Sequence, residues 1–529
     1  MTLNFILLLL ISNGLTLKIN RAILFSRLGF TIIFFDIVFS YLNSFVTYIE
    51  KGISTFGGLF SVSCITHIFE IFIFFICIMI LNLTSFYPRK KLQTHVKKKL
   101  KAAEYSEIIN KMSEQFSIIE YTLIIIFAIT GAILLINSGD LGSIYLCIEL
   151  QSFSLYIISS IHRNSESSTA SALMYFLLGG LSSCFILLGL AVVYANAGIT
   201  NTDNIYCIIS TGEVKNYKIW YNDKYIYYSL LLISVGFLFK ISAAPFHWWS
   251  PDVYDGVPTI VTTFIATLGK ISILILFMEL VEYTIVLLSK AQTYSWLSSL
   301  SLSCFFSLLI GTVLGLTQTR IKRLLAYSTI SHIGFILLAL TVHTTESYQA
   351  FLFYIFQYIL TNLNVFFIII AIGFSLYLFF TNITEINNLS EKNNSPIQLI
   401  SQLKGYFSIN PFLALCLAIT MFSFLGLPPL SGFFGKQMVL TSALDNNKTF
   451  LVIIAILTSV ISAVYYLTIL KVLYFDKTEY NKSFSYNKIC ISNYLSICIS
   501  IITLTVLFFI LIPLEPINIS NILSLIYYI

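Results

Sequence analysis

Apolar segments of the length of a membrane helix recur almost from one end of this 529-residue chain to the other, separated by polar joints. About twenty apolar residues in a helix span the hydrocarbon core of a bilayer, where backbone groups must be hydrogen-bonded within the protein. Hydrophobic residues make up 57% of the chain and charged residues 10%, whereas about a quarter of the residues in soluble domains are charged. The sequence therefore predicts one all-α polytopic membrane protein rather than several soluble domains.

We count about fourteen transmembrane helices by this length criterion. Their expected ranges are 2–16, 22–46, 59–85, 119–137, 140–161, 168–196, 225–246, 257–286, 294–317, 321–343, 347–380, 410–441, 449–475 and 490–514. The first apolar run, Leu3 to Leu15, has no basic segment before it, so we expect a retained helix rather than a cleaved leader.

Basic residues fall on alternate joints if the N-terminus is placed outside the membrane. The inward joints then carry Lys18, Arg21, Arg89, Lys90, Lys91, Lys97, Lys98, Lys99, Lys101, Lys111, Arg163, Arg320, Lys322, Arg323, Lys471, Lys477, Lys482 and Lys488. Because inner loops of membrane proteins carry an excess of Lys and Arg, we expect both termini on the outer side. The cluster at 89–111 is explained in the same way, which disfavours a nucleic-acid-binding patch.

Lys240 lies inside the apolar run YSLLLISVGFLFKISAAPF, five residues before Pro245. A lysine at the centre of a membrane helix costs about 2.5 to 3.5 kcal/mol on insertion scales, so it marks a functional site with a buried partner. Pro245 has no N–H group and would leave the carbonyl of Ile241 unpaired, which lipid does not tolerate unless protein or water supplies a donor. The lysine and the break together predict a hydrated cavity inside a helix bundle.

A second break is expected in SFLGLPPLSGFFGKQMVL, where Pro428 and Pro429 remove two donors and Lys436 follows. The breaks fall in the seventh and twelfth expected helices, an odd interval, so a repeat of helices 4–8 would recur inverted in helices 9–13. The alternative is two unrelated kinks. The repeat divides the chain into 1–118 (three helices and a basic joint), 119–286 (first five-helix repeat), 294–475 (second, inverted repeat) and 476–529 (C-terminal helix).

Three further polar residues lie inside expected helices. Glu149, in the fifth helix, is the expected counter-ion for Lys240, either as a partner whose movement loads and releases a proton or as half of a static ion pair. Lys270, in the eighth helix, needs a hydrated or hydrogen-bonded setting to hold a proton. His332, in the tenth helix, is a candidate proton relay with the packing role equally open, and Tyr327, Ser328, Thr329 and Ser331 could hold water beside it.

Other polar residues have weaker signals. We interpret Asp36 and Glu70 as helix-packing hydrogen bonders in preference to functional carboxylates, because they lie outside the proposed repeats. Trp248 and Trp249 fit an interfacial aromatic belt, while His247, Asp252 and Asp255 could line the inner mouth of a channel. The nine cysteines are scattered, which argues against a disulfide framework, a zinc site or an iron–sulfur site.

The motifs FKISAAPFHWWSPDVYDGVPT, RIKRLLAYSTISHIGF and FLGLPPLSGFFGKQ together resemble the antiporter-like membrane subunits of respiratory complex I, over residues 120 to 475. In that family a polar axis for proton translocation runs through the membrane, and the resemblance places it on Glu149, Lys240, Lys270 and Lys436, with His332 added from its own sequence context. A lysine at 436 favours the subunit with lysine at this position over the one with glutamate. No long lateral helix is expected after residue 514, which argues against the subunit that carries one.

The resemblance implies a proton-translocating subunit of NADH:ubiquinone oxidoreductase without a redox group of its own, in the mitochondrial inner membrane with both termini facing the intermembrane space. NAD, FMN, iron–sulfur clusters and ubiquinone would belong to other subunits, and no cofactor or metal is expected on this chain. The expected partners are other membrane-arm subunits, including neighbouring antiporter-like chains, and membrane lipids, but no nucleic acid. Two alternatives remain: a subunit of a multi-subunit cation/proton antiporter, and a structural anchor of the membrane arm.

Overall fold

The computed structural model describes residues 2–15, 22–43, 52–85, 120–162, 165–211, 223–290, 296–376, 397–477 and 493–528. Its helices are α1 Thr2–Leu15, α2 Ala22–Asn43, α3 Cys64–Ser85, α6 Glu120–Ile136, α7 Leu141–Ser160, α8 Glu166–Ala197, α9 Thr202–Thr211, α10 Asp223–Ile241, α11 Trp249–Gly256, α12 Thr259–Lys290, α13 Leu297–Leu316, α14 Ile321–Leu340, α15 Thr345–Leu376, α17 Pro411–Leu425, α18 Ser431–Asp445, α19 Thr449–Tyr474, α20 Asn493–Leu507 and α21 Leu514–Tyr528. Short 3-10 helices are η3 Phe56–Gly58, η5 Ile400–Leu403, η6 Tyr406–Ser408 and η8 Phe508–Leu511. The two strands are β1 Ile53–Thr55 and β2 Phe60–Val62.

The prediction of an all-α polytopic membrane protein is confirmed. Ten of the described helices are long and apolar enough to cross a membrane, and α6, α10, α17 and α21 contain shorter apolar segments. The count of fourteen crossings, the inverted repeats and the four domains stay predictions.

Three local features differ from the expected helices. The third expected helix begins at Cys64 instead of 59, because Phe60–Val62 pairs antiparallel with Ile53–Thr55. The helices α9 and α21 were not predicted, since α9 is short and α21 interleaves Asn and Ser with its apolar residues. The expected basic joint at 89–111 lies outside the described residues.

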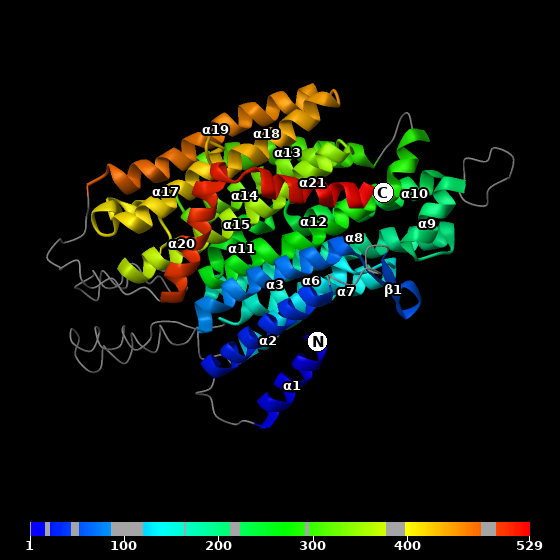
Figure 1. Ribbon diagram of the computed structural model, residues 1–529, viewed down its shortest axis with the longest axis horizontal. Coiled ribbons are helices and arrows are strands. Elements are labelled where there is room, and N and C mark those ends of the chain that lie inside the picture. Colours follow the sequence, from blue (N-terminus) through cyan, green and yellow to red (C-terminus); the bar gives the residue numbers. More distant parts are fainter. Residues whose placement is uncertain are drawn as a thin grey trace.

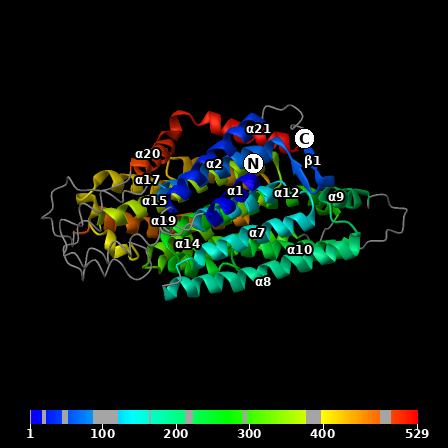
Figure 2. The same ribbon diagram turned by 90° about the horizontal axis from the view of Figure 1, so that it is seen from below.

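The helices form an elongated bundle in which α8 packs on α7 and α10, and α13 packs on α14 (Figures 1 and 2). Among the described helices α12, α14 and α15 are the most enclosed, since 94%, 89% and 83% of their apolar segments are buried inside the protein. By contrast α8, α19 and α20 present long apolar faces to the outside, as lipid-facing helices do. Lys270 and His332 therefore lie on two of the most protected helices of the protein.

Both expected breaks are present. The first separates α10, which ends at Ile241, from α11, which begins at Trp249, and its chain turns through Ser242 at a φ of 62°. The second separates α17, which ends at Leu425, from α18, and Gly426 caps α17 in the left-handed conformation that glycine adopts without a steric penalty. Each break contains a cis X-Pro peptide bond.

Candidate functional site

The predicted pair of Glu149 and Lys240 is present between α7 and the last turn of α10. Lys240 Nζ lies 3.7 Å from Glu149 Oε1, and the two side chains are 7% and 15% exposed. The separation is within ion-pair range but longer than a hydrogen bond. The geometry therefore holds an attractive pair that a small displacement of either helix would alter.

Aromatic side chains enclose the amine of Lys240. Its Nζ donates a hydrogen bond of 3.2 Å to Tyr156 Oη, and the ring of Tyr156 packs edge-on against Tyr175 of α8. Tyr175 in turn stacks on Trp249, the first residue of α11. Trp249 Nε1 donates to the carbonyl of Phe239 at 2.8 Å, so the indole satisfies a backbone acceptor beside the break.

This packing corrects one interpretation of the sequence. Trp249 is buried at 3% exposure and belongs to the wall of the Lys240 site, so it is not part of an interfacial belt. Trp248 is 73% exposed, which agrees with the belt. The two neighbours differ because α11 begins between them and turns successive side chains to opposite environments.

Lys270 lies near the middle of α12 and is 2% exposed. Its Nζ donates to Thr329 Oγ1 of α14 at 3.1 Å and lies 5.7 Å from the ring centre of Tyr254. The expected hydrogen-bonded setting is therefore provided by a hydroxyl and an aromatic face. The hydrogen bond joins α12 to α14, which fall in different repeats of the predicted division.

His332 is 5% exposed and bonded at both ring nitrogens. Nδ1 lies 2.8 Å from Tyr354 Oη of α15, and Nε2 lies 3.3 Å from Tyr466 Oη of α19. Of the four residues expected to hold water beside His332, Thr329 bonds Lys270, Ser328 and Ser331 donate to carbonyls of their own helix, and Tyr327 lines a cavity. Their role in holding water stays a prediction.

Lys436 lies in α18 and is 8% exposed. Its Nζ donates to the carbonyls of Phe424 and Leu425 at 2.8 and 2.9 Å, and it lies 5.3 Å from the ring centre of Phe335. These carbonyls belong to the last turn of α17, where a helix has no N–H groups left to pair with them. Phe424 also contacts the ring of His332, which places Lys436 next to the histidine.

Close approach at the second break requires glycine at two positions. A Cβ atom added to Gly432 would collide with the carbonyl oxygen of Ser423, and one added to Gly426 would meet the side chain of Lys436 at 2.9 Å. The glycines therefore let α18 pass close enough to α17 for Lys436 to reach its carbonyls.

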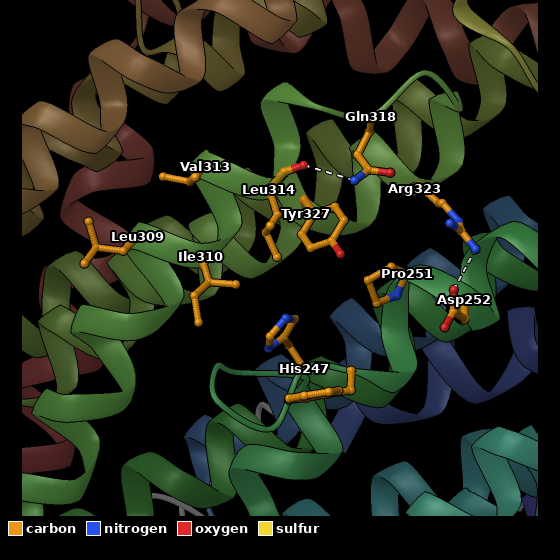
Figure 3. Close-up of a pocket in the computed structure, with 11 residues that line it drawn as sticks. His247, Pro251, Asp252, Leu309, Ile310, Val313, Leu314, Gln318, Arg323 and Tyr327 are labelled. Atoms are coloured by element: carbon orange, nitrogen blue, oxygen red, sulfur yellow. Dashed lines mark hydrogen bonds and ion pairs between the residues drawn. The ribbon is translucent and has the colours of Figure 1, made fainter.

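An open cavity of 690 Å³ lies beside the first break, between α11, α13 and α14 (Figure 3). Its polar lining residues are His247, Asp252, Gln318, Arg323 and Tyr327, and its apolar lining comes from Trp248, Pro251 and four residues of α13. His247 is mostly buried, and its Nδ1 has no hydrogen-bond partner among the described residues. The expected position of His247 and Asp252 at the mouth of a channel stays a prediction.

The carboxylates of the N-terminal helices have different surroundings. Glu70 of α3 accepts a hydrogen bond of 2.6 Å from Asn137 Nδ2 and lies 3.0 Å from His67 Nδ1. The bond from Asn137 joins α3 to the residue after α6, which agrees with the packing interpretation, whereas His67 lies on α3 itself. Asp36 of α2 is buried at 4% exposure, and one of its oxygens has no hydrogen-bond partner among the described residues.

Sequence reasoning missed the hydroxyl groups that connect the ionisable residues. Tyr156 lies two turns after Glu149 on the same face of α7, a spacing that could have drawn attention to it. Tyr354 and Tyr466 lie on α15 and α19, far along the chain from His332, and no local pattern marks them. Among the described residues no group of three or more His, Cys, Asp or Glu side chains is placed to hold a metal ion.

A family described as the NADH:quinone oxidoreductase/Mrp antiporter transmembrane family matches residues 138–462. The chain belongs to this family. All five residues of the predicted polar axis lie inside the matched segment. A relative from Rhizopus oryzae named NADH-ubiquinone oxidoreductase chain 2 is 43% identical over 525 residues, which cover 95% of each chain. The resemblance to this type of subunit, which the lysine at 436 favoured, is therefore confirmed.

Solved structures share the fold of this antiporter family member. A chain of respiratory complex I from Thermus thermophilus with bound aureothin has a TM-score of 0.70 at 23% identity, covering 98% of this chain and 99% of that one. A chain of the Mrp complex from Dietzia sp. has a TM-score of 0.70 at 16% identity, covering 99% of this chain and 96% of that one. These two likenesses support the fold rather than a particular activity.

Proposed function

We infer that this chain is a proton-translocating membrane subunit of NADH:ubiquinone oxidoreductase, of the chain 2 type, and that protons move along Glu149, Lys240, Lys270, His332 and Lys436. Relatives that carry the names of this complex support the assembly in which it works. The buried amines, the histidine and the hydroxyls between them support the route.

One observation carries the route: the Lys270–Thr329 hydrogen bond crosses from α12 to α14, the helix that also carries His332. Thr329 and His332 are three positions apart and thus neighbours on that helix. From His332 the contacts continue through Phe424 to Lys436. These contacts connect Lys270 on α12 with His332 on α14 and Lys436 on α18.

At the first lysine, Glu149 is the switchable element. Its carboxylate attracts the ammonium of Lys240 across 3.7 Å, and Tyr156 holds the amine in place from the other side. Displacement of α7 relative to α10 weakens the attraction and releases the proton. This step converts a transmitted structural or electrostatic change into proton movement without redox chemistry on this chain.

At the far lysine, backbone carbonyls replace the carboxylate. Lys436 Nζ lies at the C-terminal end of α17, where the helix dipole is negative and attracts a cation. A proton arriving on Lys436 therefore finds acceptors fixed by the helix break. The two breaks thus supply two different settings for an ammonium group.

The second candidate function is a subunit of a multi-subunit cation/proton antiporter, favoured by the likeness to the Mrp complex. The two candidates predict different partners. Purification of the chain with its native assembly is expected to yield flavin and iron–sulfur peptides, and other hydrophobic subunits alone would identify the antiporter. The isolated polypeptide is expected to show no NADH oxidation, and a stoichiometric flavin or metal retained by it would contradict the absence of a cofactor on this chain.

We further propose that the chain lies in the mitochondrial inner membrane with both termini in the intermembrane space, among neighbouring antiporter-like subunits and lipid. The basic inward joints support the orientation. The anchor hypothesis treats the same ion pairs as static, and it predicts that Lys240→Met leaves pumping intact.

A further inference from the structure

The turn that leads into α14 lies between both broken helices. This turn, residues 319–323, is called the α14 corner below. On one side it contacts α11, the short helix after the first break. On its other side it pairs with the chain that leads into α17, the helix before the second break. The corner is thus joined to the helix that follows the first break and to the segment that enters α17.

Two arginines of the corner bind two aspartates of α11. Arg320 Nη1 lies 2.6 Å from Asp255 Oδ2. Arg323 Nη2 lies 2.7 Å from Asp252 Oδ1, a pair that Figure 3 shows. Arg323 Nε is also 3.2 Å from Asp255 Oδ2, so the buried Asp255 is shared by both arginines. These contacts fix α11 at both its first and its last turn.

Lys322 strengthens the same junction. The sequence places this lysine among the charges of an inner joint, and in the structure it is the second residue of α14 and only 1% exposed. Its Nζ donates at 2.7 Å to the carbonyl of Val257, the first of the two residues between α11 and α12. The buried amine therefore holds the end of α11 that leads into the helix of Lys270.

On its other side the corner makes backbone contacts. The N–H of Ile321 donates to the carbonyl of Gln398 at 2.9 Å, and the N–H of Ile400 donates to the carbonyl of Thr319 at 3.1 Å. This segment continues through η5 and η6 into Pro411, the first residue of α17. A shift of the corner would therefore be transmitted to both sides.

The positive charges of the corner lie at the N-terminal end of α14, where they are electrostatically unfavourable. Three basic residues lie at or within the first turn of α14, where the helix dipole is positive and favours anions. The two carboxylates of α11 offset this arrangement. Without them the arginines would face an unfavourable dipole, so α11 is held electrostatically as well as by packing.

The position of α11 affects two of the lysines directly. Its first residue, Trp249, stacks on Tyr175 beside the tyrosine that binds Lys240. Five residues later, Tyr254 places its ring over the amine of Lys270. A displacement of this short helix therefore changes the walls of both amine sites.

We propose that Asp252, Asp255, Arg320 and Arg323 are positioning residues that hold α11 against the α14 corner. They thereby keep Trp249 and Tyr254 of α11 in place in the walls of the Lys240 and Lys270 sites. This inference rests on the proposed function and assigns four further residues to it. None of the four accepts a proton in the proposed route.

The pair of Asp252 and Arg323 suits a charge-swap experiment, because their side chains are 45% and 40% exposed and reversed charges stay partly hydrated. Arg323→Asp is expected to lower the number of protons pumped per NADH by about two- to fivefold in the assembled complex, since a partly exposed ion pair has a modest effect. The double variant Asp252→Arg with Arg323→Asp is expected to restore the ratio in part, because it re-forms the pair with residue 252 but not the contact of Arg323 with Asp255. Lys477→Asp, a reversal of an exposed charge outside the cluster, serves as the matched control and is expected to leave the ratio unchanged.

The ratio is measured per assembled complex, so a purely structural loss lowers the amount of complex and leaves the ratio intact. A normal ratio in Arg323→Asp, or a double variant as low as the single one, would overturn the proposal. If Arg323→Asp does not assemble, Arg323→Gln is measured instead, and a normal ratio there overturns the proposal equally. Lys240→Met is measured in parallel: normal pumping in that variant refutes the proposed function itself, whereas impaired pumping beside a normal Arg323→Asp refutes the positioning role alone.

Discussion

Replacing Glu149 by Gln removes a charge beside Lys240 and keeps the shape of the side chain. At the observed separation of 3.7 Å, Coulomb's law with an effective dielectric constant of about 20 gives an attraction of about 4.5 kcal/mol. Tyr156 continues to hold the amine, so the lysine stays in place but loses its electrostatic partner. We expect the assembled complex to be detectable and its coupled turnover to fall about tenfold or more, because each 1.36 kcal/mol corresponds to a factor of ten.

A second substitution at position 149 tests how the effect depends on the distance between the carboxylate and Lys240. Glu149→Asp keeps the charge but shortens the side chain, which lengthens the separation to about 5 Å and leaves an attraction of about 3.3 kcal/mol. This loss of about 1 kcal/mol predicts a several-fold effect, smaller than that of Gln. Glu166→Gln, the same change at an exposed position in the first turn of α8, is the matched control and is expected to behave like the unmodified chain.

The assay is NADH oxidation together with proton pumping in sealed vesicles, both normalised to the amount of assembled complex. The reasoning requires the order Glu166→Gln, Glu149→Asp, Glu149→Gln from normal to slowest. Unchanged stoichiometry and rate in assembled Glu149→Gln would refute the switching role, and the pair would then be a static one.

Further predictions concern the lysines, their partners and the topology. At Lys240 and Lys436, Met keeps the apolar stem without the amine, whereas Arg keeps a charge that is effectively never lost, so both replacements should slow coupled turnover if the amine carries a proton. Near-normal pumping in the Arg variants would refute proton carriage at that position. Thr329→Val removes the hydroxyl that binds Lys270, and the loss of a hydrogen bond to a charged group predicts about tenfold slower pumping in the assembled complex. Cysteine placed in 89–111 should react with an impermeant thiol reagent only from the matrix side, and labelling from the outer side of mitoplasts would overturn the proposed topology.

The membrane class and both helix breaks could be predicted from the sequence because their causes are local. A run of apolar residues spans the bilayer whatever its neighbours are, and Pro245 or Pro428 with Pro429 interrupts a helix wherever it packs. The five ionisable residues of the proposed axis could also be found in the sequence, since a charge inside an apolar run is costly without a partner. By contrast the β1–β2 pairing was missed, because two three-residue strands carry almost no periodic signal.

The partners of the ionisable residues were decided only by tertiary structure. Thr329 is 59 positions from Lys270, and Tyr466 is 134 positions from His332, so each contact exists only because distant helices pack together. Lys436 binds carbonyls that every residue possesses, and only the termination of α17 leaves those of Phe424 and Leu425 available. Sequence thus determined which side chains must escape lipid, because insertion cost depends on each residue and its immediate neighbours. The tertiary fold decided where they find hydrogen bonds, because distance and direction in a packed bundle depend on all the helices at once.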